Sequence, residues 1–356
     1  MKNKLSTRRR NSFISYKKKF IPYPFQYNLS SLPEIEKTEC FTDFLDAYFK
    51  KKIYFDNFEK WSLSYFGRGI SKYFMLPYNS KLFKYNLKQI RTDWFGRYMP
   101  QPDFREMLNS IDHEKNQYRG YNSLFYYPAH SGINLLIKNL SNRIKTLFCS
   151  MPVHRINPKK KWIETATQKI HYEILINTAP LPEFIEMLEP SIKEREYCIN
   201  NLEYTSVFNM NYGLETNIEN NMHWIYFPEQ KYEFYRTGFY HNFSAQMTPR
   251  GKQSAYIEVS YRNTNKIDLE FLKKIRTQFL YFGKYSKRNT KIILDFPLDI
   301  KYAYVIYNKQ RAAILENLNF YFKKNNIHNA GRYAEWNYSS MQDSILSAYK
   351  ILNSIK

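Results

Sequence analysis

The residues best suited to bind a ligand lie between positions 331 and 344, near the C-terminus. Ser339 or Ser340 is placed to cap a helix that begins at about Met341. Asp343 falls in the first turn of that helix, where a carboxylate is favoured. The backbone N–H groups at such a helix start can bind an anion or an electron-rich ring edge. A capped terminal helix that packs on a core is the alternative interpretation of the same residues.

The composition predicts a globular protein with two or three domains. The chain has 356 residues, of which 43% are hydrophobic and 18% aromatic, including 33 Tyr and 27 Phe. A disordered chain has few aromatic residues, and this length can bury substantial cores. Only 10 residues are glycine, and none stands in a Gly-x-Gly-x-x-Gly turn or a Walker loop.

The chain is strongly basic, with a net charge of +22. Its densest basic runs, at 8–10, 17–19 and 159–161, are short and far apart. Scattered charge of this kind favours a solvated basic surface over a nucleic-acid interface.

The cysteine pattern favours a reducing cytoplasm. Cys40, Cys149 and Cys198 are isolated, with neither the even count of a disulfide framework nor metal-ligand spacing. We therefore predict no metal site. The sequence also contains no apolar run long enough for a membrane span and no signal-peptide core.

Periodicity predicts the elements that position these residues. A β-hairpin is expected over 11–28, and a helical region over 32–108, with a short helix stopped by Pro77 and a loop at 78–83. A helix over 133–144 leads into short strands at 146–149, 153–156 and 161–165 and a buried parallel-type strand at 173–178. Antiparallel strands follow at 204–212, 224–227, 234–239, 254–261 and 291–296, interrupted by a helix at 269–281. The chain closes with a helix at 312–324, a strand at 327–330 and the final helix.

Five blocks of sequence, taken in this order, resemble the flavoproteins of the amine-oxidase/protoporphyrinogen-oxidase superfamily. The most similar members are UDP-galactopyranose mutase and its mutase-like relatives. The blocks are Phe-Ile-Pro-Tyr-Pro-Phe-Gln at 20–26, Phe-Gly-Arg-Gly-Ile at 66–70 with Phe-Met-Leu-Pro-Tyr-Asn at 74–79, Thr-Asp-Trp-Phe-Gly-Arg at 92–97, Trp-Ile-Tyr-Phe-Pro-Glu at 224–229 with Phe-Tyr-Arg at 234–236 and Asn-Phe-Ser at 242–244, and the stretch 331–344.

The resemblance implies a mixed α/β (α+β) fold with an incomplete FAD-binding Rossmann-like domain, a helical domain and an antiparallel-sheet substrate domain. The corresponding segments are a hairpin of the substrate sheet at 1–30, the helical domain at 31–108, part of the FAD domain at 109–185, the substrate sheet at 186–300 and a C-terminal FAD segment at 301–356. The resemblance also implies an FAD-dependent intramolecular transferase that interconverts the pyranose and furanose forms of a UDP-sugar for cell-surface polysaccharide synthesis. Reduced flavin is the expected nucleophile, through an N5–sugar adduct, so no catalytic side chain is predicted.

The resemblance also assigns residues to the substrate. Arg97 and Arg236 match two arginines that clamp the UDP diphosphate, a task suited to the planar fork of a guanidinium. The alternative for each is a surface or ion-paired arginine. Tyr23 and Gln26 match the uracil platform. The remaining substrate positions, for each of which core packing is the alternative, are Asn79, Trp224, Tyr226, Tyr304 and Tyr338.

Cofactor contacts are implied by the resemblance alone. The last FAD-contacting segment corresponds to Gly331, Arg332, Gln342, Asp343 and Ser344. Gly132 matches a loop that leads to the flavin, and Val153 matches a strand whose backbone meets the adenine.

The sequence departs from the family at its front. The first βαβ unit, with its Gly-x-Gly-x-x-Gly turn, has no counterpart before about Asn11, and that unit supplies most pyrophosphate contacts. The expectation is therefore a truncated or split product, or a chain completed by a separately encoded N-terminal Rossmann piece, with FAD binding by this chain alone in doubt.

Three alternatives to a mutase follow. Phe83, Phe243 and the Ser340 region differ from the mutase pattern, which leaves room for an amine-oxidase-like or protoporphyrinogen-oxidase-like flavin oxidoreductase. The missing Gly-x-Gly-x-x-Gly turn leaves room for an inactive fragment or a non-enzymatic partner subunit. A nucleic-acid-binding protein rests on charge alone.

Overall fold

The computed structural model describes residues 5–50, 55–95, 98–99, 102–112, 123–262, 267–282 and 290–355. The chain divides into two compact units. Unit 1 comprises Met1–Arg143 and Ser206–Lys301, and unit 2 comprises Ile144–Thr205 and Tyr302–Lys356. None of the described helices combines the length and apolarity that crossing a bilayer requires.

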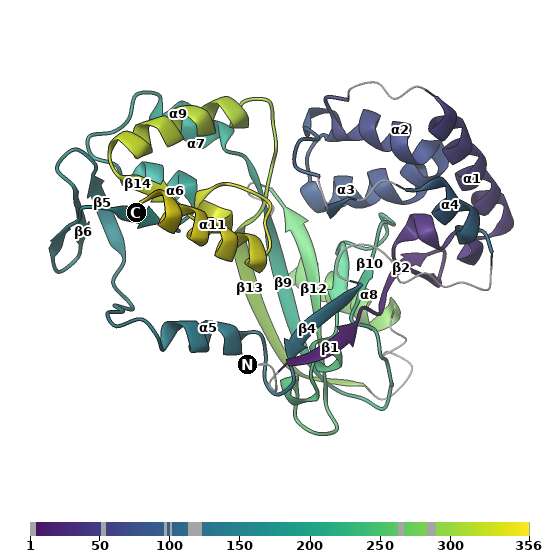
Figure 1. The fold of residues 1–356 in the computed structure, drawn as a ribbon. Helices are drawn as coiled ribbons and strands as arrows, with labels where there is room; N and C mark the ends of the chain where they lie inside the picture. Colours follow the sequence, from purple (N-terminus) through teal and green to yellow (C-terminus); the bar gives the residue numbers. More distant parts are fainter. Residues whose placement is uncertain are drawn as a thin grey trace. The chain divides into compact units, whose positions relative to one another are not determined.

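Unit 1 is built on a seven-stranded sheet in the order β13-β9-β12-β11-β10-β2-β3 (Figure 1). The predicted hairpin at 11–28 is confirmed as β2 and β3, joined by a turn at Lys17 and Lys18, both with positive φ. The neighbours from β9 to β10 pair antiparallel, but β10 runs parallel to β2, whereas the sequence predicted only antiparallel strands. The strands are β2 (Ser12–Tyr16), β3 (Lys19–Pro22), β9 (Tyr204–Glu215), β10 (Trp224–Tyr226), β11 (Arg236–Gly238), β12 (Gln253–Tyr261) and β13 (Lys291–Val305).

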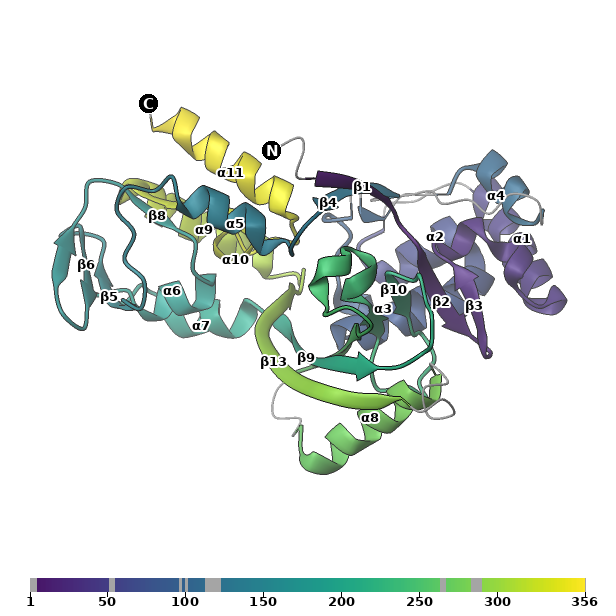
Figure 2. The ribbon, with the colours of Figure 1, turned by 90° about the horizontal axis from the view of Figure 1, so that it is seen from below.

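One face of this sheet is covered by α8 (Leu269–Phe282), which runs along β13 and β9 (Figure 2). Ile275 and Phe279 of α8 are fully buried, and the Phe279 ring lies 5.0 Å from that of Tyr212 on β9. The helix was predicted at 269–281 because its apolar residues recur at helical spacing.

The helical part of unit 1 contains α1 (Glu34–Phe49), α2 (Phe58–Ile70), α3 (Leu76–Phe83) and α4 (Phe104–Ser110). The prediction that Pro77 ends a helix and starts a loop was wrong, because Pro77 lies in the first turn of α3. A π-helical stretch, Ser71–Met75, precedes it. Proline is tolerated in a first turn, where its missing N–H has no intrahelical partner to lose.

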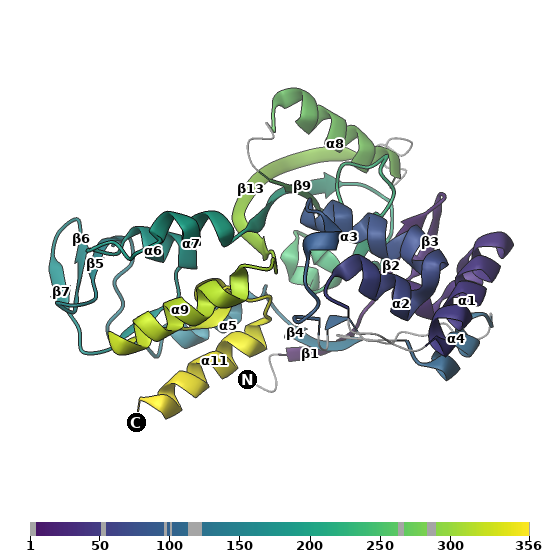
Figure 3. The ribbon, with the colours of Figure 1, turned by 90° about the horizontal axis from the view of Figure 1, so that it is seen from above.

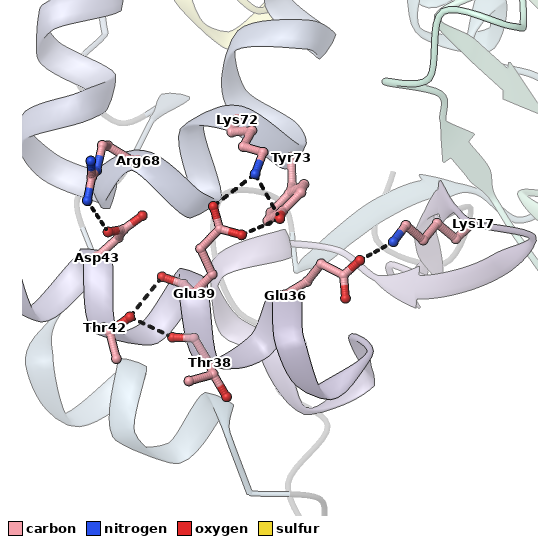
Figure 4. A network of polar contacts seen from close by, with 9 residues as sticks. All are labelled: Lys17, Glu36, Thr38, Glu39, Thr42, Asp43, Arg68, Lys72 and Tyr73. Carbon is pink, nitrogen blue, oxygen red and sulfur yellow. Dashed lines mark hydrogen bonds and ion pairs between the residues drawn. The ribbon is translucent and has the colours of Figure 1, made fainter.

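Polar contacts tie α1 to α2 and to the π-helical stretch that follows α2 (Figure 4). Arg68 contacts Asp43 at 3.3 Å, and Lys72 contacts Glu39 at 3.0 Å. The Tyr73 hydroxyl donates to the same Glu39 carboxylate. Exposed pairs of this kind contribute little stability each, so the packing of the two helices must come mainly from their buried faces.

The remaining elements of unit 1 are an antiparallel pair of strands and a short helix. They are β1 (Leu5–Arg9), β4 (Leu124–Pro128) and α5 (Asn134–Ser141).

Unit 2 contains two small sheets and five helices among its described residues (Figure 3). The predicted strands at 153–156 and 161–165 are confirmed in an antiparallel sheet with a third strand. No strand forms at 146–149, where Leu147 and Phe148 are exposed instead. The elements are β5 (Val153–Asn157), β6 (Trp162–Thr165), β7 (Lys169–His171), β8 (Leu175–Asn177), α6 (Leu181–Glu186), α7 (Arg195–Asn201), α9 (Arg311–Lys324), β14 (Ile327–Asn329), α10 (Gly331–Ala334) and α11 (Met341–Ser354).

The second sheet of unit 2 is the parallel pair β8–β14. A parallel strand was predicted at 173–178, and the direction is confirmed. Its predicted burial was wrong, since Ile174 and Ile176 are 43% and 45% exposed. Parallel strands normally have both faces covered.

Gly67 yields a stability prediction, because α1 and α2 approach at this residue. Its φ is +74°, and an added Cβ would overlap the Asp43 carbonyl and lie 2.7 Å from the Phe44 nitrogen. We expect Gly67→Ala to lower the free energy of unfolding by at least about 3 kcal/mol, measured by urea denaturation.

Gly251 provides the matched control. It has the same φ of +74°, but an added Cβ would meet nothing within 4 Å. Gly251→Ala should therefore cost only the backbone strain, about 1 kcal/mol. Equal losses in the two variants would contradict the close helix contact.

Candidate functional site

The predicted substrate residues of unit 1 gather on one face of its sheet. Trp224 and Tyr226 are two residues apart on β10, so their side chains leave the same face. Arg236 on β11 lies directly opposite Tyr226 in the antiparallel register. Directly opposite residues share a face, so strand pairing brings these three side chains together.

Tyr23 joins this group from the segment after β3. Its ring lies 4.9 Å from that of Tyr226, and the Tyr226 ring lies 5.2 Å from that of Tyr78 on α3. Burial raises the pKa of both Tyr23 and Tyr226. Both phenols therefore stay protonated at neutral pH and can donate hydrogen bonds.

Arg10 belongs to the same group, and the sequence interpretation missed it. It was part of a basic run assigned to the solvated surface, yet it is only 2% exposed. Its guanidinium lies 4.8 Å from the centre of the Tyr23 ring, and burial lowers its pKa. A cation–π contact of this kind positions the Tyr23 ring and leaves positive charge beside it.

Gln26 and Asn79 are both buried in unit 1. The Asn79 side-chain amide donates to the Met75 carbonyl at 2.7 Å. The Asn79 Oδ1 atom is buried and accepts no hydrogen bond from any described residue. Because buried polar atoms are normally paired, this oxygen is a candidate acceptor for a ligand donor.

Arg236 forms a two-pronged ion pair with Glu258 on β12. Its Nε and Nη2 atoms donate to the two carboxylate oxygens at 2.6 and 2.9 Å. The two side chains are 27% and 11% exposed, and the residues are paired in the β11–β12 register. Together they are electrically neutral, so Glu258 competes with any anionic ligand for the guanidinium.

Glu258 was not predicted, although its position carried a signal. It is a carboxylate within the otherwise apolar run Ala255–Val259 of a central strand. A charge in such a place is rarely buried without a partner. The required partner, one strand away, could be found only from the register.

No contact with this group is described for two further predicted residues of unit 1. Arg97 lies outside the described residues, so its contact with a diphosphate stays a prediction. Gly132 precedes α5, and an added Cβ there would lie 2.9 Å from the Met247 sulfur. It marks a close approach of two chain segments.

The remaining predicted residues belong to unit 2, where Tyr304, Tyr338 and Arg332 form one cluster. The two tyrosine rings are stacked 6.1 Å apart, and the Arg332 guanidinium lies 4.9 Å from the Tyr338 ring centre. Arg332 also donates to the carbonyls of Ser339 and Ala303 at 2.9 and 2.6 Å. Its visible role is to hold the loop before α11 against the end of β13.

The stretch 331–344 contains the predicted capped helix start. Ser340 and Asp343 form a capping box, with the Ser340 amide donating to Asp343 at 2.7 Å and the Asp343 amide donating to Ser340 at 3.3 Å. Ser344 donates to the Ser340 carbonyl at 3.3 Å, and Gln342 is exposed. Gly331 has φ +80° and donates its amide to the Ser347 hydroxyl at 3.2 Å.

Val153 is the first residue of β5 and pairs with Thr165 on β6. It is partly buried. Contact of its backbone with an adenine stays a prediction.

Comparison with solved structures decides the fold. Reduced UDP-galactopyranose mutase matches with a TM-score of 0.86 and 22% identity, over 94% of this chain and 74% of that one. The chain has the fold of UDP-galactopyranose mutase. At this identity the likeness establishes the mixed α/β mutase fold and not the mutase activity.

Other solved structures match less closely. A structure named for protoporphyrinogen oxidase, from Exiguobacterium sp. 255-15, has a TM-score of 0.72 and 15% identity, over 99% of this chain and 82% of that one. A CLA-producing fatty acid isomerase from P. acnes has a TM-score of 0.59 and 11% identity, over 98% and 78%. No protein-family model matches the sequence. The resemblance seen in the five blocks is thus confirmed as a resemblance of fold.

FAD is the cofactor that this fold implies, but the described residues of unit 2 do not by themselves fit its pyrophosphate. The Asp343 and Ser344 amides in the first turn of α11 donate to Ser340, and the Asp343 carboxylate at that helix start repels an anion. The helix that begins at Gly331 has only four residues. Among the described residues of unit 2, neither helix start therefore offers a phosphate-binding turn.

Lys81 was placed in a loop by the sequence interpretation, but it is a buried residue of α3, only 4% exposed. Its ammonium donates to the carbonyls of Phe227 and Glu229 at 3.0 and 2.8 Å. These bonds fix the segment that follows β10. Burial, assisted by the nearby Lys84 cation, lowers the pKa of Lys81 to about 7.

The lowered pKa of Lys81 predicts a pH-dependent stability. In the unfolded chain its pKa is about 10.4, so between about pH 7 and pH 10 the unfolded state binds the extra proton. The free energy of unfolding should therefore rise with pH in this range, by at most ~1.4 kcal/mol per pH unit from this group. Urea denaturation over the range should show a smaller slope in Lys81→Met. An unchanged slope in Lys81→Met, or the same reduction in the exposed control Lys88→Met, would contradict this account.

The Arg236–Glu258 pair predicts a second stability effect. Arg236→Met leaves a buried carboxylate without its cation and should lower the free energy of unfolding by about 3 kcal/mol, measured by chemical denaturation. Arg236→Met/Glu258→Met should recover most of that loss, because it removes both charges.

The exposed pair Arg276–Asp295 is the control, with side chains 46% and 57% exposed and a separation of 3.7 Å. Arg276→Met should cost less than about 1 kcal/mol. If the double variant at 236 and 258 were no more stable than Arg236→Met, the pair would not be coupled as described.

Proposed function

We propose that the chain is a component of an FAD-dependent enzyme of the UDP-galactopyranose mutase type, whose unit 1 binds the nucleoside diphosphate part of a UDP-sugar. The proposal implies an incomplete FAD domain in unit 2 and a substrate-binding unit 1. The observation that carries it is the convergence of Tyr23, Tyr226 and Arg236 on one face of the sheet.

The chemistry of this face suits a uridine diphosphate. Aromatic rings offer stacking surface for a pyrimidine, and the buried Gln26 amide can pair with its polar edge. The Asn79 oxygen can accept from a sugar or ribose hydroxyl. Arg236, with Arg97 as its predicted companion, is suited to the diphosphate. The Glu258 partner of Arg236 holds the guanidinium in place until an anion competes for it.

A flavin oxidoreductase acting on another substrate is the second candidate. Two observations favour it: the protoporphyrinogen oxidase match covers 99% of this chain, and Glu258 already neutralises the arginine proposed for the diphosphate. Reduction of bound flavin by an amine or a lipid, together with failure of UDP to bind, would select this candidate. A fragment or partner subunit without activity would show neither flavin reduction nor UDP binding.

Binding of UDP to the isolated chain tests the proposal. UDP should raise the unfolding midpoint in a concentration-dependent way, because a ligand that binds only the folded state stabilises it. Arg236→Lys keeps the positive charge but loses the planar pair of guanidinium donors. It should weaken UDP binding roughly tenfold or more in calorimetry.

Arg276→Lys on α8 is the matched control and should leave UDP affinity unchanged. Absence of any UDP stabilisation in a folded wild-type chain would contradict the proposal. So would equal affinity for UDP and for inorganic pyrophosphate, because that would mean that the uracil platform contributes nothing.

A further inference from the structure

Unit 2 contains a pocket that is lined by none of the residues assigned above to a substrate or to a cofactor. Its cavity volume is about 510 Å³, which lies within the range of small-molecule sites. Helices α7 and α9, the segment that leads into α7 and the turn between β5 and β6 surround it. Every lining residue belongs to unit 2, so the pocket exists within one compact unit. We call it the α7–α9 pocket.

One face of α9 forms an apolar wall of this pocket. Ala313, Asn317 and Tyr321 line it at four-residue spacing, and Ile314 and Leu318 line it beside them. Side chains at this spacing share one face of a helix. Ile314 and Leu318 are each only 3% exposed, so this wall belongs to the core of unit 2 and offers apolar contact area to a ligand.

Helix α7 supplies a second wall through Tyr197 and Cys198. Burial raises the pKa of the Cys198 thiol, with a smaller contribution from the Glu194 carboxylate, and burial also raises the pKa of the Tyr321 phenol. Both groups are therefore uncharged at neutral pH. The rings of Tyr197 and Tyr321, one from each wall, provide stacking surface for an aromatic ligand.

The charges of the pocket lie on Lys159, Lys193 and Glu194, all of which are exposed. Lys159 comes from the β5–β6 turn, and the other two residues come just before α7. Neither lysine forms an ion pair with a described residue. Two cations and one anion leave an excess of one positive charge, which suits a carboxylate monoanion better than a phosphate dianion.

We propose that the α7–α9 pocket binds a small aromatic carboxylate, whose ring packs on the α9 face and whose carboxylate is held by Lys159 and Lys193. The apolar wall and the tyrosines account for the ring, and the excess positive charge accounts for the carboxylate. This inference goes beyond the proposed function. It rests on unit 2 alone, so failure of UDP to bind unit 1 would leave it standing.

Titration calorimetry with 2-naphthoate tests the proposal on the full chain. Ala313→Trp places a large side chain in the pocket from an exposed position of α9, and should weaken 2-naphthoate binding by at least about tenfold. Ala312→Trp is the matched control, because Ala312 is the exposed neighbour on the same helix and does not line the pocket. Its affinity should be that of the unchanged chain, and thermal unfolding checks that both variants fold.

A second pair of variants tests the charge. Lys159→Met/Lys193→Met should weaken 2-naphthoate binding by about tenfold and leave the binding of the neutral 2-naphthylmethanol unchanged. Lys160→Met/Lys323→Met removes two exposed charges of unit 2 outside the pocket and should change neither affinity.

Amide hydrogen exchange locates the bound probe. Saturating 2-naphthoate should slow exchange in α7 and α9, because a ligand that bridges the two helices opposes their local opening. Absence of saturable 2-naphthoate binding to the folded chain would overturn the proposal, and so would an equal loss of affinity in Ala312→Trp and Ala313→Trp. Tighter binding of 2-naphthyl phosphate or of 2-naphthylmethanol than of 2-naphthoate would overturn the assignment of a carboxylate.

Discussion

Backbone pairing between three neighbouring strands places the central residues of the candidate substrate face. The register sets Tyr226 of β10 opposite Arg236 of β11, and Arg236 opposite Glu258 of β12. The intervening residues Ile225, Thr237 and Ile257 point to the other face and are fully buried. A slip of one residue would exchange the two faces, so the apolar core holds the register and the register holds the site.

This arrangement has an electrostatic consequence for a strongly basic chain. Arg236 is neutralised by Glu258, whereas Arg10 lies over the Tyr23 ring. The positive charge that matters for a ligand is therefore placed by burial and partners and does not follow from the net charge of +22. Unit 2 differs, since its described parallel pair and last helix carry large apolar side chains that are about half exposed.

The sequence predicted features that depend on local pattern. The β2–β3 hairpin, helix α8 and the capping box of α11 follow from alternation, helical spacing and a Ser-x-x-Asp signature, all within a few residues. The ordered blocks also led to the correct fold. Features that depend on distant partners were missed: Arg10 is buried by residues far along the chain, and Glu258 requires a strand partner. Pro77 was misassigned because a π-helical stretch before it made helix continuation possible.

Amide hydrogen exchange of the isolated chain tests the central claim most directly, namely that a buried core holds the strand register of unit 1 while the short, exposed parallel pair and last helix of unit 2 are held less firmly. The account predicts that β9 and β12 exchange only through global unfolding. The β8, β14 and α11 amides should exchange at least ~100-fold faster, through local opening. Equal protection of β8, α11 and β12 in the chain alone would contradict it.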